Sequence, residues 1–426
     1  MIEKLYQYFL KSTGVSTDTR TVQHGQLFFA LNGPNFDANK FAEKALEAGA
    51  MLAVVDDEGY VKGDQYFLVS DALESLQQLA NFHRKQLDIP FIGITGSNGK
   101  TTTKELMRDV LAQKYNVVAT IGNLNNHIGV PLTLLSIKED TEIGIIEMGA
   151  NHVGEIEALC EIAEPTHGLI TNIGEAHLKG FGGIEGVIRG KSELYNFLIQ
   201  SEGVAFVNSQ NEILSNMAKR RIKEPVFYGA EGDFYAASLL TSTPSIQYAT
   251  DKNIKVSTQL SGGYNFENIT AALCVGRFFE VDENSANEAV ANYVPSNNRS
   301  QLIEQGNIKI ILDAYNANPS SMKAALDNLV KLDGSKAVIL GDMFELGEAS
   351  EAAHVELGRL TANLGFDKVI FCGALSKSGK EGNPDALYFI TKTELATYLV
   401  LNPIEQDHLL IKGSRGMGLE TLLKCL

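Results

Sequence analysis

A glycine-rich turn between a strand and a helix constrains this chain more than any other feature. Residues 91–95 are apolar and mostly β-branched, whereas residues 96–99 (Gly-Ser-Asn-Gly) cannot hold regular structure. After Thr101 the apolar spacing becomes helical, with Leu106 four residues before Val110. The order of strand, glycine loop and helix is typical of phosphate-binding sites, because loop amides and a helix N-terminus both stabilise an anion.

Two residues at the start of the predicted helix suit the same chemistry. The ammonium of Lys100 would contact a phosphate, and the hydroxyl of Thr101 would bind Mg²⁺. A strict phosphate loop has another glycine where this chain has Ile94, and an ordinary strand-to-helix turn is the alternative explanation. We predict a nucleotide triphosphate site formed by Gly96, Ser97, Asn98, Gly99, Lys100, Thr101 and Thr102.

Length and composition describe a multidomain protein and exclude some partners. At 426 residues the chain exceeds what one core usually supports. Its formal charge of -16, from 52 acidic and 36 basic residues, disfavours nucleic acid and anionic lipid as partners. No apolar run is long enough to span a membrane, and the first residues do not resemble a signal peptide. The four cysteines are widely separated, which predicts a reduced, cytoplasmic protein. We also expect a monomer.

Alternating strands and helices predict an α/β chain of three domains. We expect a small α/β N-terminal substrate domain at residues 1–84, a central phosphate-loop ATPase-type domain with a parallel sheet at 85–296, and a C-terminal Rossmann-like domain at 297–426. Predicted strands are residues 26–31, 51–55, 91–95, 141–147, 167–171, 309–312, 337–340, 368–371, 387–390 and 409–411, with further strands among residues 201–260. Helices are predicted at residues 41–48 and 184–200.

Functional side chains are expected at the carboxyl ends of these strands, where open parallel sheets bind ligands. Glu147 ends one predicted strand, and His177 follows another in a glycine-bearing loop, so both would face the phosphates at Lys100. Taken alone, His177 also fits a solvated or structurally bonded histidine. The polar loops 313–319, 341–347 and 412–416 predict that the last domain turns a functional face toward the central one.

Lys191 is the least expected residue of the chain. It falls at helical spacing between Val187 and Leu194, in the stripe that should face the core. Burial lowers the pKa of an amine, and a neutral amine takes up carbon dioxide to give a carbamate that suits Mg²⁺. The alternatives are an ammonium that reaches the surface or pairs with a carboxylate such as Glu193.

Two further polar positions admit two interpretations each. Residues 17–20 (Thr-Asp-Thr-Arg) fit a capped loop, or recognition of an anionic or uracil-bearing group by Arg20 and its neighbours. Asn268 precedes an Ala-rich helix, which it would cap unless it contacts a base.

Together these motifs resemble the Mur ligases, ATP-dependent amide-forming enzymes of peptidoglycan precursor synthesis. The resemblance covers nearly the whole chain, through residues 95–101, 147–150, 171–177, the helix with Lys191, residues 265–268, Arg299 and residues 313–319. Within the family, residues 315–319 and 341–347 are similar to segments of the ligase that adds D-alanyl-D-alanine to UDP-N-acetylmuramoyl-tripeptide. The Asp-Asn-Pro-Arg motif of the ligase that adds the third residue is absent.

The resemblance implies a reaction through an acyl phosphate, with ATP and two magnesium ions. One ion would lie at Thr101 and Glu147, and the other at His177 and a carbamylated Lys191. The remaining implied contacts are Asn268 with adenine, Arg299 and Asp313 with the nucleotide, Asn125 and Asn126 with the peptide substrate, Thr19 and Arg20 with the uridine end, Asn316 and Asn318 with substrate, and Lys412, Ser414 and Arg415 with the dipeptide carboxylate.

The chain departs from the family pattern at a few positions. Thr19 stands in place of serine, Ala38 and Asn39 in place of Gly-His, and Tyr264 in place of histidine. The alternative functions are the third-residue ligase, folylpolyglutamate synthase, or a nucleotide-dependent binding module without ligase chemistry.

Overall fold

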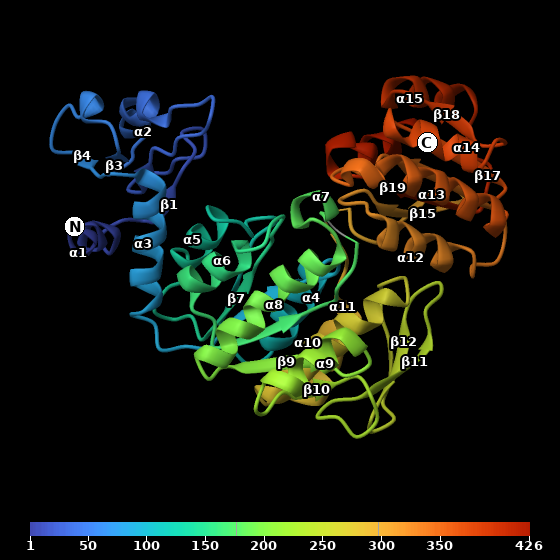
Figure 1. The fold of residues 1–426 in the computed structure, drawn as a ribbon, viewed down its shortest axis with the longest axis horizontal. Helices are drawn as coiled ribbons and strands as arrows, with labels where there is room; N and C mark the ends of the chain where they lie inside the picture. Colours follow the sequence, from blue (N-terminus) through green and yellow to red (C-terminus); the bar gives the residue numbers. More distant parts are fainter. Residues whose placement is uncertain (176, 297) are drawn as a thin grey trace.

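The strands of the described residues form four sheets, which lie in three lobes that follow one another along the chain (Figure 1). The computed structural model describes residues 1–175, 177–296 and 298–426. Figure 1 shows the N-terminal and C-terminal lobes on opposite sides of the central one. The predicted α/β class is confirmed. Asn297, at the predicted domain boundary, and Ala176, in the predicted histidine loop, lie outside the described residues, and the domain limits stay predictions.

The N-terminal lobe contains a parallel sheet in the order β1-β2-β3-β4. Its elements are α1 (Ile2–Phe9), β1 (Val15–Ser16), β2 (Leu27–Phe29), η1 (Ala38–Phe41), α2 (Ala42–Glu47), β3 (Leu52–Val55), η2 (Glu58–Tyr60), β4 (Tyr66–Leu68) and α3 (Ala72–Arg84). Side chains alternate across β2, as the period of two in a strand requires: Leu27 and Phe29 pack toward α1 and α3, whereas Phe28 packs toward α2.

Helix α3 joins this lobe to the central one. Arg84 at its end donates from Nε to the carbonyl of Ala163 at 2.9 Å, and its guanidinium lies 4.0 Å from the ring centroid of Phe91. His83 contacts the carbonyl of Ile137 at 3.0 Å. Because one hydrophobic cluster runs from α1 and α3 into the central sheet, apolar burial holds the two lobes together.

The central sheet has six parallel strands in the order β10-β9-β8-β5-β7-β6, so β5 lies in its interior. Its strands are β5 (Phe91–Thr95), β6 (Val117–Ala119), β7 (Ile143–Glu147), β8 (His167–Ile170), β9 (Val204–Asn208) and β10 (Val226–Tyr228). Strands of the parallel sheet end at one edge, which brings together the glycine loop, Glu147 and the loop after β8. The predicted strands 91–95, 141–147 and 167–171 are confirmed, although β7 begins two residues late.

Helices cover both faces of this sheet, and a small antiparallel sheet follows it. These elements are α4 (Lys100–Leu111), α5 (Gly129–Leu134), α6 (Glu155–Ala163), α7 (Leu178–Phe181), α8 (Ile184–Gln200), α9 (Glu212–Arg221), β11 (Ala237–Thr241), β12 (Gln247–Thr250), β13 (Lys255–Ser257), α10 (Tyr264–Phe278) and α11 (Glu283–Asn292). The predicted helix 184–200 is confirmed. The interpretation of Asn268 as a helix cap is wrong, because α10 already begins at Tyr264 and Asn268 lies inside it.

The C-terminal lobe contains a six-stranded sheet in the order β14-β15-β19-β16-β17-β18, in which only β14 is antiparallel. Its elements are β14 (Gln301–Gln305), β15 (Ile308–Asp313), α12 (Pro319–Leu329), β16 (Lys336–Gly341), η3 (Gly347–Ala349), α13 (Ser350–Leu364), β17 (Lys368–Cys372), η4 (Leu375–Ser378), α14 (Gly379–Gly382), β18 (Leu387–Phe389), α15 (Lys392–Leu401), β19 (His408–Lys412), η5 (Arg415–Met417) and η6 (Leu419–Cys425). All five strands predicted here are confirmed within one or two residues.

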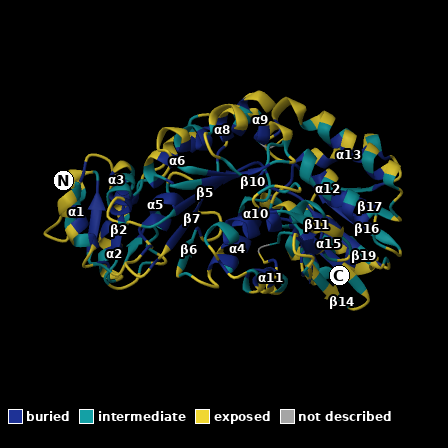
Figure 2. Cartoon of the chain, turned by 90° about the horizontal axis from the view of Figure 1, so that it is seen from below, coloured by how far each residue is buried: buried dark blue, intermediate teal, exposed yellow. Residues whose placement is uncertain are grey.

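The three polar loops of this lobe follow neighbouring strands. Since β19 pairs with both β15 and β16, the loops after these strands lie side by side at one edge of the sheet. Figure 2 shows interior strands such as β5, β7, β16 and β19 buried and the outer faces of the helices exposed. Within the described residues, we find no helix with the length and apolarity that crossing a membrane requires.

Candidate functional site

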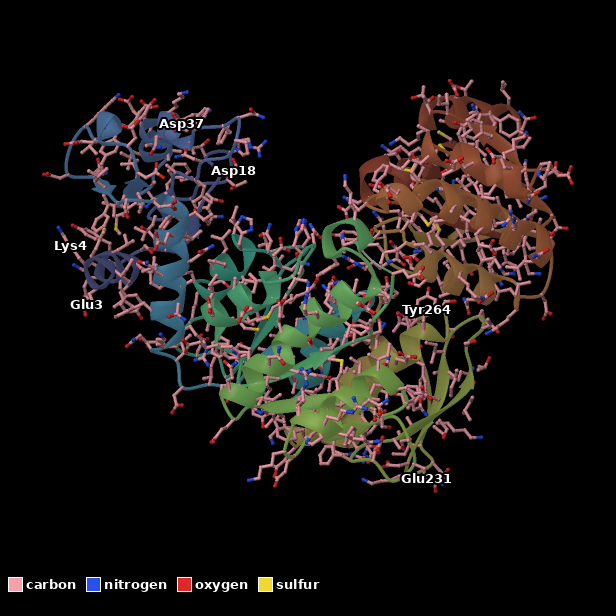
Figure 3. All side chains as sticks on the ribbon, in the orientation of Figure 1. Glu3, Lys4, Asp18, Asp37, Glu231 and Tyr264 are labelled. Carbon is pink, nitrogen blue, oxygen red and sulfur yellow. The ribbon has the colours of Figure 1, made fainter. Side chains whose placement is uncertain are left out.

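A cavity of about 870 Å³ opens where the central and C-terminal lobes meet. Figure 3 labels one of its lining residues, Tyr264, at this junction. Most predicted site residues line it: Ser97, Asn98, Gly99, Lys100, Thr101, Thr102, Asn125, Asn126, Glu147, His177, Asn268, Arg299, Asp313, Asn316, Lys412, Ser414 and Arg415. Gly96, Lys191, Asn318, Thr19 and Arg20 are not among the lining residues. The glycine loop is therefore open to a ligand rather than packed beneath protein.

The loop requires glycine at two positions. Gly96 and Gly99 have φ angles of 143° and 78°, which other residues rarely adopt. A Cβ atom on Gly96 would lie 2.0 Å from Thr171 Oγ1, and one on Gly99 would lie 2.4 Å from Asn268 Oδ1. The loop after β8 holds this shape: Asn98 N donates to Asn172 Oδ1 at 3.0 Å, and Thr171 Oγ1 donates to the Asn98 carbonyl at 2.6 Å.

Lys100 is folded back over the same loop. Its Nζ donates to the carbonyl of Gly96 at 2.6 Å and to that of Ser97 at 3.3 Å. Burial lowers the pKa of Lys100, against the opposing attraction of Glu147. An anion in the loop would restore the charged form by attraction, so the lysine is placed to bind phosphate.

Glu147 lies at the centre of a buried polar cluster at the end of β7. Its Oε1 accepts hydrogen bonds from Thr101 Oγ1 at 3.1 Å and Asn125 Nδ2 at 2.8 Å. Its Oε2 lies 3.6 Å from Lys104 Nζ and accepts no hydrogen bond. The side chains of Lys104 and Glu147 are 2% and 1% exposed, and burial lowers the pKa of Lys104. A buried carboxylate oxygen that accepts no hydrogen bond destabilises the fold unless a cation binds to it.

This cluster fits a magnesium ion. Mg²⁺ is usually held by one or two carboxylates together with waters and substrate phosphates, not by a cage of protein ligands. Thr101 and Glu147 supply oxygen atoms beside the phosphate loop, and the unsatisfied Oε2 atom supplies the vacant lone pairs. Among the residues that the structure describes, we find no group of three or more His, Cys, Asp or Glu side chains that would hold a metal without a ligand.

Lys191 is buried, as the helical spacing predicts. It is 1% exposed, its Nζ donates to the carbonyl of Ala150 at 3.3 Å, and the amine lies 5.1 Å from the ring centroid of Phe181. An ammonium that reaches the surface is therefore ruled out. Glu193 instead accepts backbone hydrogen bonds from Gly154 and Glu157.

The buried site changes the ionisation of this amine. Burial, reinforced by repulsion from Lys100, lowers the pKa of Lys191 to about 7. A substantial fraction of neutral amine is therefore present near neutral pH, which is the form that reacts with carbon dioxide.

His177 connects the central lobe to the C-terminal lobe. Its Nδ1 contacts Oε2 of Glu345, a residue of the loop after β16. Burial lowers the pKa of His177 while Glu345 opposes the shift, so the two effects compete. The contact was not anticipated from the sequence, which assigned no role to Glu345.

The C-terminal wall of the cavity contains an aromatic ring with two arginines close to it. The guanidinium carbon atoms of Arg299 and Arg415 lie 3.4 and 5.6 Å from the ring centroid of Tyr315. Lys412 is buried and pairs with Asp313, whose Oδ2 is 2.5 Å from its Nζ. Arg415 pairs with Glu420 at 3.0 Å, but its side chain is 57% exposed and can reach a ligand.

The amides predicted to contact ligands already have protein partners. Asn268 Nδ2 donates to Asn265 Oδ1 at 2.9 Å, and its Oδ1 accepts from Thr103 at 3.0 Å. Asn126 accepts from two backbone amides at the start of α5, and Asn316 Oδ1 accepts from Ala317 N. Asn318 is 4% exposed and caps α12. The ligand contacts of these residues stay predictions.

The predicted uridine contacts lie in the N-terminal lobe, where Figure 3 labels the neighbouring Asp18. Arg20 is exposed and makes a bidentate ion pair with Asp18, with Nη2–Oδ2 at 2.6 Å. The hydrogen bonds from Arg20 lower the pKa of Asp18 to about 2. The structure does not bring Thr19 and Arg20 into the interlobe cavity, so a ligand that contacts both must extend from one lobe to another.

Two residues of the site were missed in the sequence. Lys104 lies one helical turn after Lys100, and this spacing of four was the available signal. Glu345 gave no local signal, because its contact with His177 depends on how two lobes meet.

Comparisons with known proteins agree on one family. Residues 11–96 match the Mur ligase family catalytic domain, residues 94–276 the Mur ligase middle domain, and residues 298–415 the Mur ligase glutamate ligase domain. UDP-N-acetylmuramoyl-tripeptide--D-alanyl-D-alanine ligase of Bacillus subtilis is 36% identical over 427 residues, which span 97% of this chain and 93% of that protein.

Two solved structures are similar over almost their whole length. A crystal structure of MurF from Acinetobacter baumannii has a TM-score of 0.88 and 31% identity, and the match covers 100% of this chain and 98% of that one. MurF ligase from Thermotoga maritima in complex with ADP has a TM-score of 0.85 and 28% identity, with 98% and 97% of the two chains covered.

Proposed function

The chain belongs to the Mur ligase family, and we propose that it joins D-alanyl-D-alanine to UDP-N-acetylmuramoyl-tripeptide in an ATP-dependent reaction of peptidoglycan precursor synthesis. One observation carries the assignment: the phosphate loop, Glu147 and the polar loops of the C-terminal lobe line a single cavity. A nucleotide, a carboxylic acid and an amine can therefore meet there. The full-length similarity to ligases of this name supports the choice of substrates.

The chemistry requires these residue types. A carboxylate is a poor acyl donor, so the terminal carboxylate of the tripeptide attacks the γ-phosphate of ATP and forms an acyl phosphate with release of ADP. The amine of the dipeptide then displaces phosphate and forms the amide. In the first step two anions must approach each other, and Lys100 with the loop amides offsets their repulsion. Since an acyl phosphate hydrolyses readily, the C-terminal lobe must exclude water before the amine attacks.

ATP binding at the loop is supported by the ADP complex of the Thermotoga maritima ligase. We assign Thr101 and Glu147 to one magnesium ion, whose bound charge would stabilise the phosphates. His177 and a carbamylated Lys191 are the candidates for a second ion. Among the residues that line the cavity, Asn268, Arg299 and Asp313 are assigned to the nucleotide, Asn125, Asn126 and Asn316 to the peptide substrates, and Lys412, Ser414 and Arg415 to the dipeptide carboxylate. Outside its lining, Asn318 is assigned to the peptide substrates, and Thr19 and Arg20 to the uridine end.

We place the reaction in the cytoplasm, because ATP and a UDP-linked precursor are its substrates. The four cysteines are free thiols in the structure, which agrees with a reducing compartment.

The assignment is tested by phosphate release from the purified protein with ATP, Mg²⁺ and UDP-N-acetylmuramoyl-tripeptide. We expect release only when D-alanyl-D-alanine is also present. Release with a single amino acid in its place would favour the third-residue ligase. ATP turnover that neither peptide changes would favour a nucleotide-dependent binding module.

A further inference from the structure

Glu345 lines the cavity and has no role in the assignments above. It lies in the loop after β16, its side chain is 57% exposed, and its carboxylate contacts His177 of the central lobe. Its backbone has a φ of 65°, which few non-glycine residues adopt. The loop therefore presents a negatively charged group at the boundary between the two lobes, next to the loop after β8.

The neighbouring loop carries the groups assigned to the dipeptide carboxylate. Ser414 Oγ accepts a hydrogen bond from Phe344 N at 3.0 Å, and Ser414 N donates to the carbonyl of Asp342 at 3.1 Å. These two bonds join the loop after β16 to the loop after β19, and the strands themselves are paired. Glu345 and Arg415 are thus held in adjoining loops of one lobe, and both face the same cavity.

Other carboxylates of the cavity are engaged or belong to the central lobe. Those that line it are Glu147, Glu155, Glu267, Asp313 and Glu345. Asp313 pairs with Lys412, and Glu147 lies beside Lys104 in the proposed metal cluster. Glu155 accepts from the backbone of Asn151 and contacts His152, and burial raises the pKa of Glu267. Of the described residues, Glu345 is the lining carboxylate that stands on the C-terminal lobe without a lysine or arginine partner.

We propose that Glu345 binds the ammonium group of the incoming D-alanyl-D-alanine. The inference rests on the proposed function and assigns the subsite that binds the amino end of the dipeptide. A free dipeptide is a zwitterion, and adjoining loops that carry a carboxylate and a guanidinium match its two charges. In this arrangement the dipeptide carboxylate binds Arg415, and its ammonium group takes the place of His177 Nδ1 on the Glu345 carboxylate. The amine then lies beside the central-lobe loops that hold the phosphates.

The test compares two compounds that differ only in the amine. D-alanyl-D-alanine is the substrate, and propionyl-D-alanine keeps the carboxylate but has hydrogen in place of the amino group, so it acts as a competitive inhibitor. Because charge-assisted hydrogen bonds are strong, Glu345→Gln should raise the KM for D-alanyl-D-alanine about tenfold or more. The inhibition constant of propionyl-D-alanine and the KM values of ATP and UDP-N-acetylmuramoyl-tripeptide should change less than about twofold.

Three further variants complete the design. Glu345→Asp keeps the charge and tolerates the positive φ, so it should restore part of the dipeptide affinity. Glu348→Gln removes an exposed carboxylate of η3, which follows this loop and lies outside the cavity, and should leave every constant unchanged. Arg415→Met should weaken the binding of D-alanyl-D-alanine and of propionyl-D-alanine alike, because both compounds carry the carboxylate. Thermal melting of each variant checks that it is folded.

The outcomes separate the inference from the proposed function. An unchanged KM for D-alanyl-D-alanine in Glu345→Gln would overturn the inference, as would an equal loss of affinity for propionyl-D-alanine. A changed magnesium requirement with an unchanged dipeptide KM would also overturn it, because Glu345 would then act on His177 rather than on substrate. Wild-type protein that releases no phosphate with the dipeptide would overturn the proposed function itself, and the inference with it.

Discussion

Asn318 Nδ2 donates a hydrogen bond to Asn98 Oδ1 at 2.9 Å, so the phosphate loop is bonded directly to the C-terminal lobe. Asn98 Nδ2 donates in turn to Ser320 Oγ at 3.3 Å. Asn318 also caps α12, since its Oδ1 accepts from Ser321 N at 2.9 Å. A displacement of the loop on nucleotide binding would therefore be transmitted to the first turn of α12.

We predict that Asn318→Asp lowers activity with little loss of stability. Aspartate keeps the helix cap but cannot donate to Asn98, so the bond from Asn318 to Asn98 is lost and two oxygen atoms face each other there. The bond from Asn98 to Ser320 is kept. The KM for ATP should rise several-fold, while the free energy of unfolding should change by less than about 1 kcal/mol. Steady-state phosphate release and thermal melting measure the two quantities.

A double-mutant cycle tests whether the bond itself is responsible. The effects of Asn98→Ala and Asn318→Asp on the KM for ATP should not be additive, because both substitutions remove the hydrogen bond between these two residues. Asn328→Ala is the matched control, since it removes another bond between these lobes, to Ser261 at 3.0 Å, away from the loop. Additive effects of Asn98→Ala and Asn318→Asp on the KM for ATP would refute the coupling.

Lys100→Ala should abolish turnover. The lysine is the full positive charge held over the glycine loop, and the γ-phosphoryl transfer depends on charge stabilisation. We expect phosphate release with both substrates to fall by at least about 1,000-fold. Lys62→Ala, which removes an exposed ammonium paired with Glu43, should have no effect. Near-normal rates in Lys100→Ala would remove the central assignment.

Lys191→Ala should lose activity that short carboxylic acids partly restore. The pKa of about 7 makes the neutral amine available near neutral pH, and removal of the side chain leaves space beside Phe181 and Ala150 for formate or acetate. The same acids should not rescue Lys100→Ala, because a carboxylate cannot replace an ammonium at the phosphates. Failure of rescue would count against a carbamate.

A direct measurement of the carbamate does not depend on activity. With carbon-13 bicarbonate, the wild-type protein should show a carbamate signal by NMR that Lys191→Ala lacks. The signal should grow as the pH rises through about 7, since the neutral fraction of Lys191 increases. Identical spectra from the two proteins would contradict the proposal.

The sequence predicted those parts of the site that depend on local pattern. The loop at Gly96, the burial of Lys191 and the position of Glu147 at a strand end all follow from spacing along one element. Contacts between elements could not be predicted from such spacing. The hydrogen bond between Asn98 and Asn318, for example, depends on the orientation of two lobes. Of the two interpretations of Asn268, the helix cap was wrong because a glycine, Gly263, occupies that position and gave no side-chain signal.

A buried histidine distant from the cavity, His167, should make the stability of the fold depend on pH. His167 begins β8, and its ring centroid lies 6.2 Å from that of Phe206 and 5.5 Å from that of Phe278. Burial lowers the pKa of His167 to about 4 from an ordinary value of 6.5. Between these pH values the unfolded chain binds a proton that the folded protein does not, so stability decreases as the pH falls.

The size of this effect decides whether it is measurable. From the difference between the pKa of His167 in the folded and unfolded states, lowering the pH from 7 to 4.5 should reduce the unfolding free energy by about 2 to 3 kcal/mol. His167→Phe keeps an aromatic ring among the phenylalanines but cannot titrate. Between pH 7 and 4.5 its unfolding free energy should therefore fall by about 2 to 3 kcal/mol less than that of the wild type. Denaturant unfolding at both pH values provides the measurement, and His24→Gln, which changes an exposed histidine, should behave as the wild type. Equal pH slopes for His167→Phe and the wild type would mean that the folded protein protonates His167 as readily as the unfolded chain, so burial would not keep this ring neutral.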